Sequence, residues 1–355
     1  MSKSSVYALI LAGGGGTRLW PASRRSRPKQ LLTLGGRESL LAATFRRTTR
    51  VLDPEHTLVV TAADQADAIL RELPDLPPEN LVAEPAARNT GPAVGLGAVM
   101  VARRAGDDAR LAVLPSDAFI ANEAGFAQVL GKAFEHAAET IVTIGIKPTR
   151  PETGYGYLQR GKPVRDGVFE VARFVEKPDA PTAARYLAGG DFLWNAGMFF
   201  LTAGRLMAEA KTHLPDLATI LDEIRAAKDP LQTAAQRYPS APKISIDYGI
   251  MEKASGIRLV PGDFGWNDVG SWSALSEIRD KDSAGNVVSG DVILSAVSGS
   301  VLVSEPGAPL LGVVGVDDIV VVATKDAVLV VKKDRAQEVR AVVDALAADK
   351  RHQLL

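Results

Sequence analysis

The sequence is defined first by what it lacks. It has no cysteine, which excludes disulfides, thiolate catalysis and cysteine-ligated zinc. Its formal net charge is only −1, so no global field draws it to nucleic acid or to an anionic membrane. The apolar run VYALILA is too short to span a bilayer, lacks a strongly basic leader and runs straight into glycines, which argues against a signal peptide. We therefore expect a cytoplasmic protein.

Two catalytic patterns are also missing. The sequence has no G-x-S-x-G elbow and no H-E-x-x-H metal motif. Its 4 histidines are scattered, and we interpret them as surface or structural residues. Chemistry that uses a protein nucleophile is therefore not indicated.

Apolar runs alternate with helical periodicity over the first 145 residues, which predicts a Rossmann-like α/β fold: a mostly parallel sheet with helices on both faces. In such sheets ligands bind at the carboxyl ends of the strands. The expected strands are 6–11, 57–61, 81–83, 111–114 and 141–146, and the expected helices are 63–73, 90–104, 126–139 and one carrying Leu41, Phe45, Thr48 and Leu52 on one face.

Two further regions follow. Residues 147–282 contain more loops and more aromatic residues, and short Val-rich runs from 287 to 331 indicate a small β domain. A helix is expected over 335–347, with Val339, Val342, Val343 and Leu346 on one face. We divide the chain into a first domain, 1–282, with halves of about 1–146 and about 147–282, and a β-rich domain, 283–355, that ends in a helix.

Consecutive glycines, Gly13–Gly16, follow the first expected strand, and Arg18 and Lys29 come next. Bare backbone lets N–H groups approach an anion, and the two basic side chains suit phosphate oxygens. A flexible turn with solvated cations explains the same residues. The glycine run fits neither a P-loop nor a dinucleotide-binding fingerprint. The Lys-Ser/Thr pair of the former and the acidic residue that binds the ribose in the latter are missing.

The whole string decides between these interpretations. LAGGGGTRLWPASRRSRPKQLL (11–32) resembles the signature of sugar-phosphate nucleotidyltransferases, and its Trp-Pro and Arg-Pro-Lys-Gln resemble the mannose-1-phosphate guanylyltransferase branch. Further pieces occur in the family's order: EPAARNTGPA (84–93), LPSD (114–117), KPTRPETGYGY (147–157), FVEKP (174–178), WNAGMFF (194–200), SIDYGIMEKA (245–254) and WNDVGSW (266–272). In LPSD, Ser116 and Ala118 replace the Ala and His of the commoner family form.

The resemblance implies that an oxygen of mannose 1-phosphate attacks the α-phosphorus of GTP, with Mg²⁺ or another divalent metal as cofactor. It implies Arg18, Lys29, Lys177 and Asp268 as catalytic residues, and Asp117 and Asp268 as metal ligands. Nucleotide binding falls to Leu11, Ala12, Gly13, Gly14, Gly16, Thr17, Arg18, Lys29, Glu84, Asn89, Thr90, Ser116 and Asp117. Sugar-phosphate binding falls to Gly154, Tyr155, Gly156, Glu176, Lys177, Asn195 and Asp247.

The resemblance makes 1–282 the catalytic domain, with a nucleotide half of about 1–146 and a sugar-phosphate half of about 147–282. It also implies a left-handed β-helix-like C-terminal domain and a homodimer. With four scattered histidines and no metal-ligand cluster for an isomerase, we expect transferase activity alone.

Taken alone, several of these residues have simpler explanations. Asp117 suits a turn or a helix cap, Glu84 a solvated loop, and the pair Glu176 and Lys177 a solvated strand end. Asp247 either caps the helix that follows or supports the sugar site. At the level of function, the rivals are a nucleotidyltransferase for another hexose or base, and a nucleotide-sensing paralogue without catalysis.

Overall fold

The computed structural model describes residues 6–14 and 16–355, which fall into two compact units. The sheet unit comprises Met1–Gly13, Phe45–Ser116 and Asn122–Trp266. The tail unit comprises Gly14–Thr44, Asp117–Ala121 and Asn267–Leu355. From Gly14 on, the glycine-rich signature therefore belongs to the tail unit, whereas Leu11, Ala12 and Gly13 belong to the sheet unit. Our division at residues 282 and 283 stays a prediction.

Within the described residues, the sheet unit contains a 9-stranded sheet of order β3-β2-β1-β4-β9-β6-β10-β8-β7. Its strands are β1 (Val6–Ala12), β2 (Thr57–Ala62), β3 (Leu81–Glu84), β4 (Arg110–Pro115), β6 (Val142–Ile146), β7 (Tyr157–Pro163), β8 (Phe169–Val175), β9 (Phe192–Thr202) and β10 (Arg258–Gly262).

The strands β3, β2, β1 and β4 are parallel, as the alternating pattern predicts. The sheet as a whole is mixed rather than mostly parallel, because β9 runs antiparallel to both β4 and β6, and β7 and β8 are antiparallel to their neighbours. As a result, β9 begins at the edge where β4 and β6 end: Asn195 lies beside Gly145, and Trp194 lies beside Ile146.

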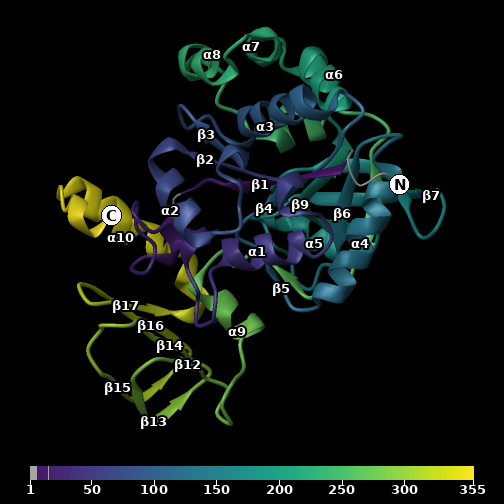
Figure 1. Ribbon diagram of the computed structural model, residues 1–355. Coiled ribbons are helices and arrows are strands. Elements are labelled where there is room, and N and C mark those ends of the chain that lie inside the picture. Colours follow the sequence, from purple (N-terminus) through teal and green to yellow (C-terminus); the bar gives the residue numbers. More distant parts are fainter. Residues whose placement is uncertain (1–5, 15) are drawn as a thin grey trace. The chain divides into compact units, whose positions relative to one another are not determined.

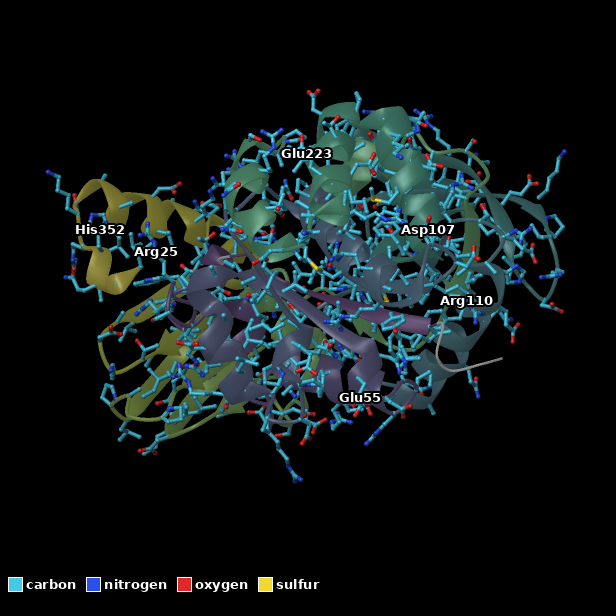
Figure 2. All side chains as sticks on the ribbon, turned by 45° about the horizontal axis from the view of Figure 1, so that its top comes forward. Arg25, Glu55, Asp107, Arg110, Glu223 and His352 are labelled. Carbon is cyan, nitrogen blue, oxygen red and sulfur yellow. The ribbon has the colours of Figure 1, made fainter. Side chains whose placement is uncertain are left out.

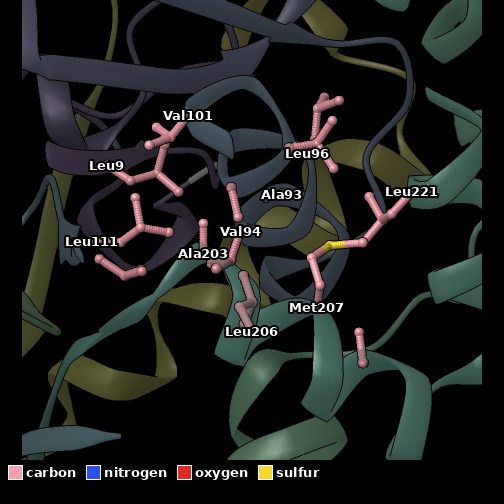
Figure 3. Close-up of a cluster of buried hydrophobic side chains, with 14 of the residues drawn as sticks. Leu9, Ala93, Val94, Leu96, Val101, Leu111, Ala203, Leu206, Met207 and Leu221 are labelled. Carbon is pink, nitrogen blue, oxygen red and sulfur yellow. The ribbon is translucent and has the colours of Figure 1, made fainter. Parts of the chain in front are cut away.

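Helices cover both faces of this sheet (Figure 1). They are α2 (Ala66–Glu72), α3 (Thr90–Ala105), α4 (Glu123–His136), α5 (Ala180–Gly189), α6 (Ala203–His213), α7 (Pro215–Ala226) and α8 (Pro230–Arg237). Figure 3 shows Val94 of α3 among Leu9 and Leu111 of the strands and Leu206 of α6, all at most 1% exposed. Figure 2 shows charged residues such as Glu223 of α7 on the outside of the helices, where it pairs with Arg237 of α8. The helix α1 (Leu40–Thr49) joins the two units along the chain.

The tail unit contains a β-helix. Its strands are β12 (Val287–Ser289), β13 (Val292–Ser298), β14 (Val301–Ser304), β15 (Leu311–Asp317), β16 (Ile319–Ala323) and β17 (Val328–Lys332). Alternate strands stack in parallel, β12 on β14 on β16 in one sheet and β13 on β15 in another, so the chain coils from one sheet to the other. The expected β-helix-like domain is confirmed. The tail unit also holds β5 (Phe119–Ile120) and α9 (Leu275–Ile278), and β11 (Trp266–Asn267) crosses the boundary.

The last helix differs from the prediction. Residues Lys333–Val339 form a tight 3-10 segment, and the α-helix α10 is confined to Arg340–Ala348. Val339 and Leu346 are buried, but Val342 is 37% exposed, because it precedes Val343 by one residue and so points about 100° away from the buried face. The strand β15 had not been predicted, because Gly312 and Gly315 interrupt its valines and, of its seven residues, Val313 alone is buried.

Two other expectations need correction. The helix expected over 126–139 begins at Glu123, where the Asn122 side chain accepts a hydrogen bond from Gly125 N, and ends at His136. Leu52 is buried but lies beyond the end of α1. In the described part of the chain, every helix is too short or too polar to span a lipid bilayer.

Candidate active site

The signature loop of the tail unit is held by Gly16 and Lys29. Gly16 has φ +56°, and a Cβ built on it would lie 2.4 Å from the Cβ of Lys29. Both observations require glycine, because a larger residue would be strained and would push Lys29 away. Gly16 therefore lets the chain pass close against Lys29. Gly15 lies outside the described residues.

Lys29 joins the two expected metal ligands. Its Nζ lies 2.6 Å from Asp117 Oδ2 and donates to the main-chain carbonyl of Asp268 at 2.5 Å. The Lys29 side chain is 12% exposed and that of Asp117 is 40% exposed. The carboxylate of Asp268 accepts a hydrogen bond from Gly270 N, which fixes the turn. Three residues that are far apart in the sequence are thus brought together within one unit.

The other signature residues line the same loop. Arg18 is exposed and donates from Nη1 to Gln337 Oε1 at 3.0 Å. Thr17, also exposed, begins the short turn Thr17–Leu19. The Trp20 indole donates to the carbonyl of Leu354 at 2.8 Å, and the Trp272 indole donates to the carbonyl of Trp20. The C-terminal segment therefore supports the signature loop, a role that sequence reasoning missed.

In the sheet unit, the nucleotide-side residues lie at strand ends. Leu11 and Ala12 end β1, and Ser116, which is 2% exposed, follows β4 and donates its N–H to the carbonyl of Leu11 at 3.2 Å. Glu84 ends β3. This edge is the one where ligands bind in α/β sheets.

The loop from Glu84 to Thr90 is tied into the fold. Asn89, with φ +69°, caps α3 by accepting from Thr90 N at 2.8 Å. The hydroxyl of Thr90 accepts from Ile246 N at 3.0 Å. Glu84 Oε1 accepts from the hydroxyl of Tyr238, a contact that sequence reasoning missed. Burial raises the pKa of Glu84 above its ordinary value, although the hydrogen bond from Tyr238 lowers it.

The sugar-side residues gather in the sheet unit. Glu176 Oε1 lies 2.7 Å from Lys177 Nζ, with Glu176 only 7% exposed and Lys177 53% exposed. Asn195 Nδ2 donates to Asp247 Oδ1 at 3.1 Å, and its Oδ1 accepts from Gly197 N. Lys177 has φ +46°, so its backbone turns sharply before Pro178. The solvated strand end therefore does not describe Glu176.

Electrostatics identify Asp247 as a member of this cluster. Burial, followed by the charge of Glu176, raises the pKa of Asp247 from 3.8 to about 6, against the opposing effects of Lys177 and Asn195. For Lys177, burial lowers the pKa, but the hydrogen bond and charge of Glu176 raise it above its ordinary value. Asp247 begins a π-helical turn, Asp247–Met251, without capping it. The sequence left two roles open for Asp247, a helix cap or support of the sugar site, and its contacts match support of the sugar site.

A side chain at position 156 would displace the carboxylate of Glu176. A Cβ there would lie 2.5 Å from Glu176 Oε2. The neighbouring Gly154 donates its N–H to Glu152 Oε1 at 3.0 Å, and Tyr155 packs edge-on against Trp194 and Trp266.

Two glutamates missed by sequence reasoning support the cluster. Glu152 holds the turn at Gly154, and Glu252 Oε1 accepts from Glu176 N at 2.7 Å. Both lie inside quoted motifs, but their spacing from the site gives no local signal.

The chemical character of the site follows from these residues. Among the described residues, no group of three or more His, Cys, Asp and Glu side chains is arranged to hold a metal by itself. Asp117 and Asp268 are oxygen donors of the kind Mg²⁺ takes, one or two at a time, when phosphate oxygens and water complete its shell. Each cluster by itself combines a lysine with carboxylates, groups that bind phosphates, metal ions and hydroxyls.

Comparison with known proteins agrees with this chemistry. The family model of nucleotidyl transferases matches residues 7–285, and that of the mannose-phosphate isomerase/GMP-like β-helix domain matches 282–346. The chain is 40% identical to the mannose-1-phosphate guanylyltransferase of Escherichia coli K12, over 99% of this chain and 76% of the relative. It is 42% identical to the xanthan biosynthesis protein XanB of Xanthomonas campestris, over 99% and 75%.

A solved structure extends the similarity to three dimensions. A crystal structure from Thermus thermophilus, described as a mannose-1-phosphate geranyltransferase, is 38% identical with a TM-score of 0.88 and covers 97% of this chain and 99% of its own. The sheet, the β-helix and the family models point the same way, and the chain belongs to the nucleotidyl transferase family.

Proposed function

We propose that this protein is a mannose-1-phosphate guanylyltransferase, which converts GTP and α-D-mannose 1-phosphate into GDP-mannose and diphosphate. A phosphate oxygen of the sugar phosphate forms a bond to the α-phosphorus of GTP, and the bond from that phosphorus to the β-phosphate oxygen breaks. The observation that carries the proposal is the contact of Lys29 with Asp117 and Asp268, in a chain about 40% identical to proteins of this name.

The tail unit supplies the groups for the triphosphate. The Lys29 ammonium is balanced by Asp117. We propose that a bound triphosphate draws this ammonium to its oxygens and that Arg18 exchanges Gln337 for a phosphate oxygen, because charge-assisted bonds to phosphate are stronger than a bond to a neutral amide. These groups offset the charge that develops on departing diphosphate.

The same residues fit a divalent metal. Asp117 and Asp268 would hold Mg²⁺, each as one oxygen ligand or through water. When bound, the ion offsets the negative charge of the phosphate oxygens.

The sheet unit supplies the groups for the sugar. Buried Glu176 and Asp247 are strong acceptors for sugar hydroxyls, and half-exposed Lys177 suits the phosphate. Glu84, with Asn89 and Thr90, is our candidate for guanine, whose N1–H and 2-amino group match a carboxylate.

The test measures diphosphate release. Purified protein is mixed with Mg²⁺ and each pairing of GTP, ATP, UTP or dTTP with mannose or glucose 1-phosphate. We expect the highest kcat/KM for GTP with mannose 1-phosphate. A higher value for another pair would replace this substrate assignment, and binding of GTP without turnover of any pair would favour the nucleotide-sensing alternative.

We also propose that the protein is a cytoplasmic homodimer. Exposed apolar side chains on the β-helix, such as Ile293 and Val314, at 62% and 71% exposed, support an interface there. Sedimentation equilibrium measures the assembly state, and a monomer at micromolar concentration would contradict this proposal.

A further inference from the structure

Tyr238 occupies an unusual position for a core tyrosine. It follows α8 in the short turn Tyr238–Ser240, its side chain is 0% exposed, and its hydroxyl donates to Glu84 Oε1, a partner 154 residues away in the sequence. Both residues belong to the sheet unit. A buried hydroxyl normally pairs with a nearby backbone carbonyl or water, whereas this one pairs with a carboxylate at the end of a strand.

The hydrogen bond from Tyr238 affects the orientation and the ionisation of the Glu84 carboxylate. Burial and the adjacent Glu84 raise the pKa of Tyr238 further above its ordinary value, so the phenol remains a donor at any physiological pH. A permanent donor fixes the rotamer of the carboxylate and favours its ionised form. Because Oε1 is engaged by Tyr238, Oε2 and the second lone pair of Oε1 are left for a ligand.

The neighbourhood of Tyr238 holds the rest of the loop. Arg88 donates from Nη2 to the carbonyl of Pro239, and Gly91 N donates to the carbonyl of Ile244 at 3.0 Å. The chain segment after α8 therefore holds in place, by hydrogen bonds, the loop that begins at Glu84. The same segment leads directly into Asp247 of the sugar cluster.

We infer that Tyr238 is a positioning residue for base recognition: its hydroxyl holds the carboxylate of Glu84 so that the remaining oxygen sites meet the N1–H and 2-amino donors of guanine. This inference rests on the proposed function, because it takes guanine as the base. Tyr238 touches no substrate in this scheme and acts only through Glu84.

The key variant is Tyr238→Phe, which keeps the ring and removes the donor. We expect KM for GTP to rise about tenfold with kcat and the KM for mannose 1-phosphate nearly unchanged. The preference for GTP over ITP, which lacks the 2-amino group, should shrink by a similar factor. Tyr7→Phe is the matched control, because Tyr7 is equally a buried tyrosine of the sheet unit, at the opposite end of β1 from the glycine loop.

A double-mutant cycle with Glu84→Gln tests the route of action. If Tyr238 acts through Glu84, Tyr238→Phe causes no further loss of GTP selectivity in the Glu84→Gln background. Additive losses, or an unchanged GTP/ITP ratio in a folded Tyr238→Phe protein, would overturn the inference.

Direct titration of GTP, ITP and ATP by calorimetry distinguishes a failure of the Tyr238 inference from a failure of the proposed function. Preferential GTP binding that depends on Tyr238 supports the inference even in a protein that turns nothing over. Active transfer with equal affinity for all three nucleotides removes Tyr238 and Glu84 from base recognition and leaves the transferase intact.

Discussion

Two clusters in this protein combine acids with a lysine, and they are balanced differently. In the sheet unit, Glu176 and Asp247 face the single ammonium of Lys177, and burial, followed by the charge of Glu176, raises the pKa of Asp247 to about 6. In the tail unit, Lys29 lies against Asp117 and a main-chain carbonyl, and its charge is offset by the Asp117 carboxylate.

This difference in charge balance predicts that the two clusters bind their ligands differently. An excess of buried acceptors is ready for neutral hydroxyl donors and needs no rearrangement to receive them. Both lysines are paired with an acid, Lys177 with Glu176 and Lys29 with Asp117, so each must loosen an ion pair before it can serve a phosphate. The sheet-unit cluster differs because it holds a second carboxylate, Asp247, beside that pair. We therefore expect changes in the tail-unit cluster to affect turnover most, and changes in the sheet-unit cluster to affect sugar affinity.

The largest effect is expected for Asp117→Asn and Asp268→Asn. Each should lower kcat by orders of magnitude and shift the Mg²⁺ requirement upward, because charge stabilisation at phosphate is the main catalytic effect. Steady-state rates across a Mg²⁺ titration measure both quantities. Asp318→Asn, which loses a surface ion pair with Lys333 in the same unit, is the control and should stay near wild type. Wild-type rates for both test variants in limiting Mg²⁺ would refute the metal assignment.

Lys177→Ala should have the next largest effect. The loss of a charge-assisted bond to phosphate, about 1.5–3 kcal/mol, corresponds to roughly ten- to a hundredfold in kcat/KM for mannose 1-phosphate. GTP affinity should change little, which calorimetry can check. An equal loss for GTP would place Lys177 on the nucleotide instead and would erase the contrast between the clusters.

Gly156→Ala tests whether the sheet-unit cluster is prepared in advance. The new Cβ would displace Glu176 Oε2, so KM for the sugar phosphate should rise by roughly threefold to tenfold, about 0.7–1.4 kcal/mol. Gly131→Ala is the matched control, because a Cβ at Gly131 of α4 meets nothing within 4 Å. If the two variants behave alike, close packing at Gly156 has no role in sugar binding.

The smallest effect concerns stability and comes from Asp247→Asn. Because the folded-state pKa of Asp247 is raised to about 6, ionising this group costs stability as the pH rises from about 4 through 6. The variant should therefore melt a few degrees, about 2–5 °C, above wild type at pH 8 and together with it at pH 4. Thermal unfolding at both values checks this, and a difference independent of pH would contradict a buried ionised carboxylate.

The parallel half of the sheet could be predicted from sequence because its strands are continuous apolar runs buried on both faces. VYALILA and TLVVTA show this pattern clearly. The strands β7 and β8 could not, because one face of each is exposed and charged residues interrupt the runs. In β9 the polar Asn195 and a glycine interrupt the apolar pattern of a buried strand. The amphipathic helices α6 to α8 lie in a region where we expected more loops and assigned no helix.

The site shows the same limit. Its central residues lie in distinctive motifs, so the resemblance could nominate them, and the structure brings Glu176 to Lys177 and Asn195 to Asp247. Their partners could not be nominated, because Tyr238 and Gln337 contact Glu84 and Arg18 across more than a hundred intervening residues. Tertiary contacts of this kind leave no trace in local periodicity.

The hydrogen bond from Trp20 to the carbonyl of Leu354 changes how this chain can be re-engineered. A purification tag placed directly after Leu355, or a deletion of the last turn, acts on the backbone beside the Thr17–Leu19 turn rather than on a dispensable end. Insertion of a tag into the exposed loop around Asp166, in the other unit, attaches nothing to the backbone beside Leu354. For fusion and display, that loop is the safer attachment point.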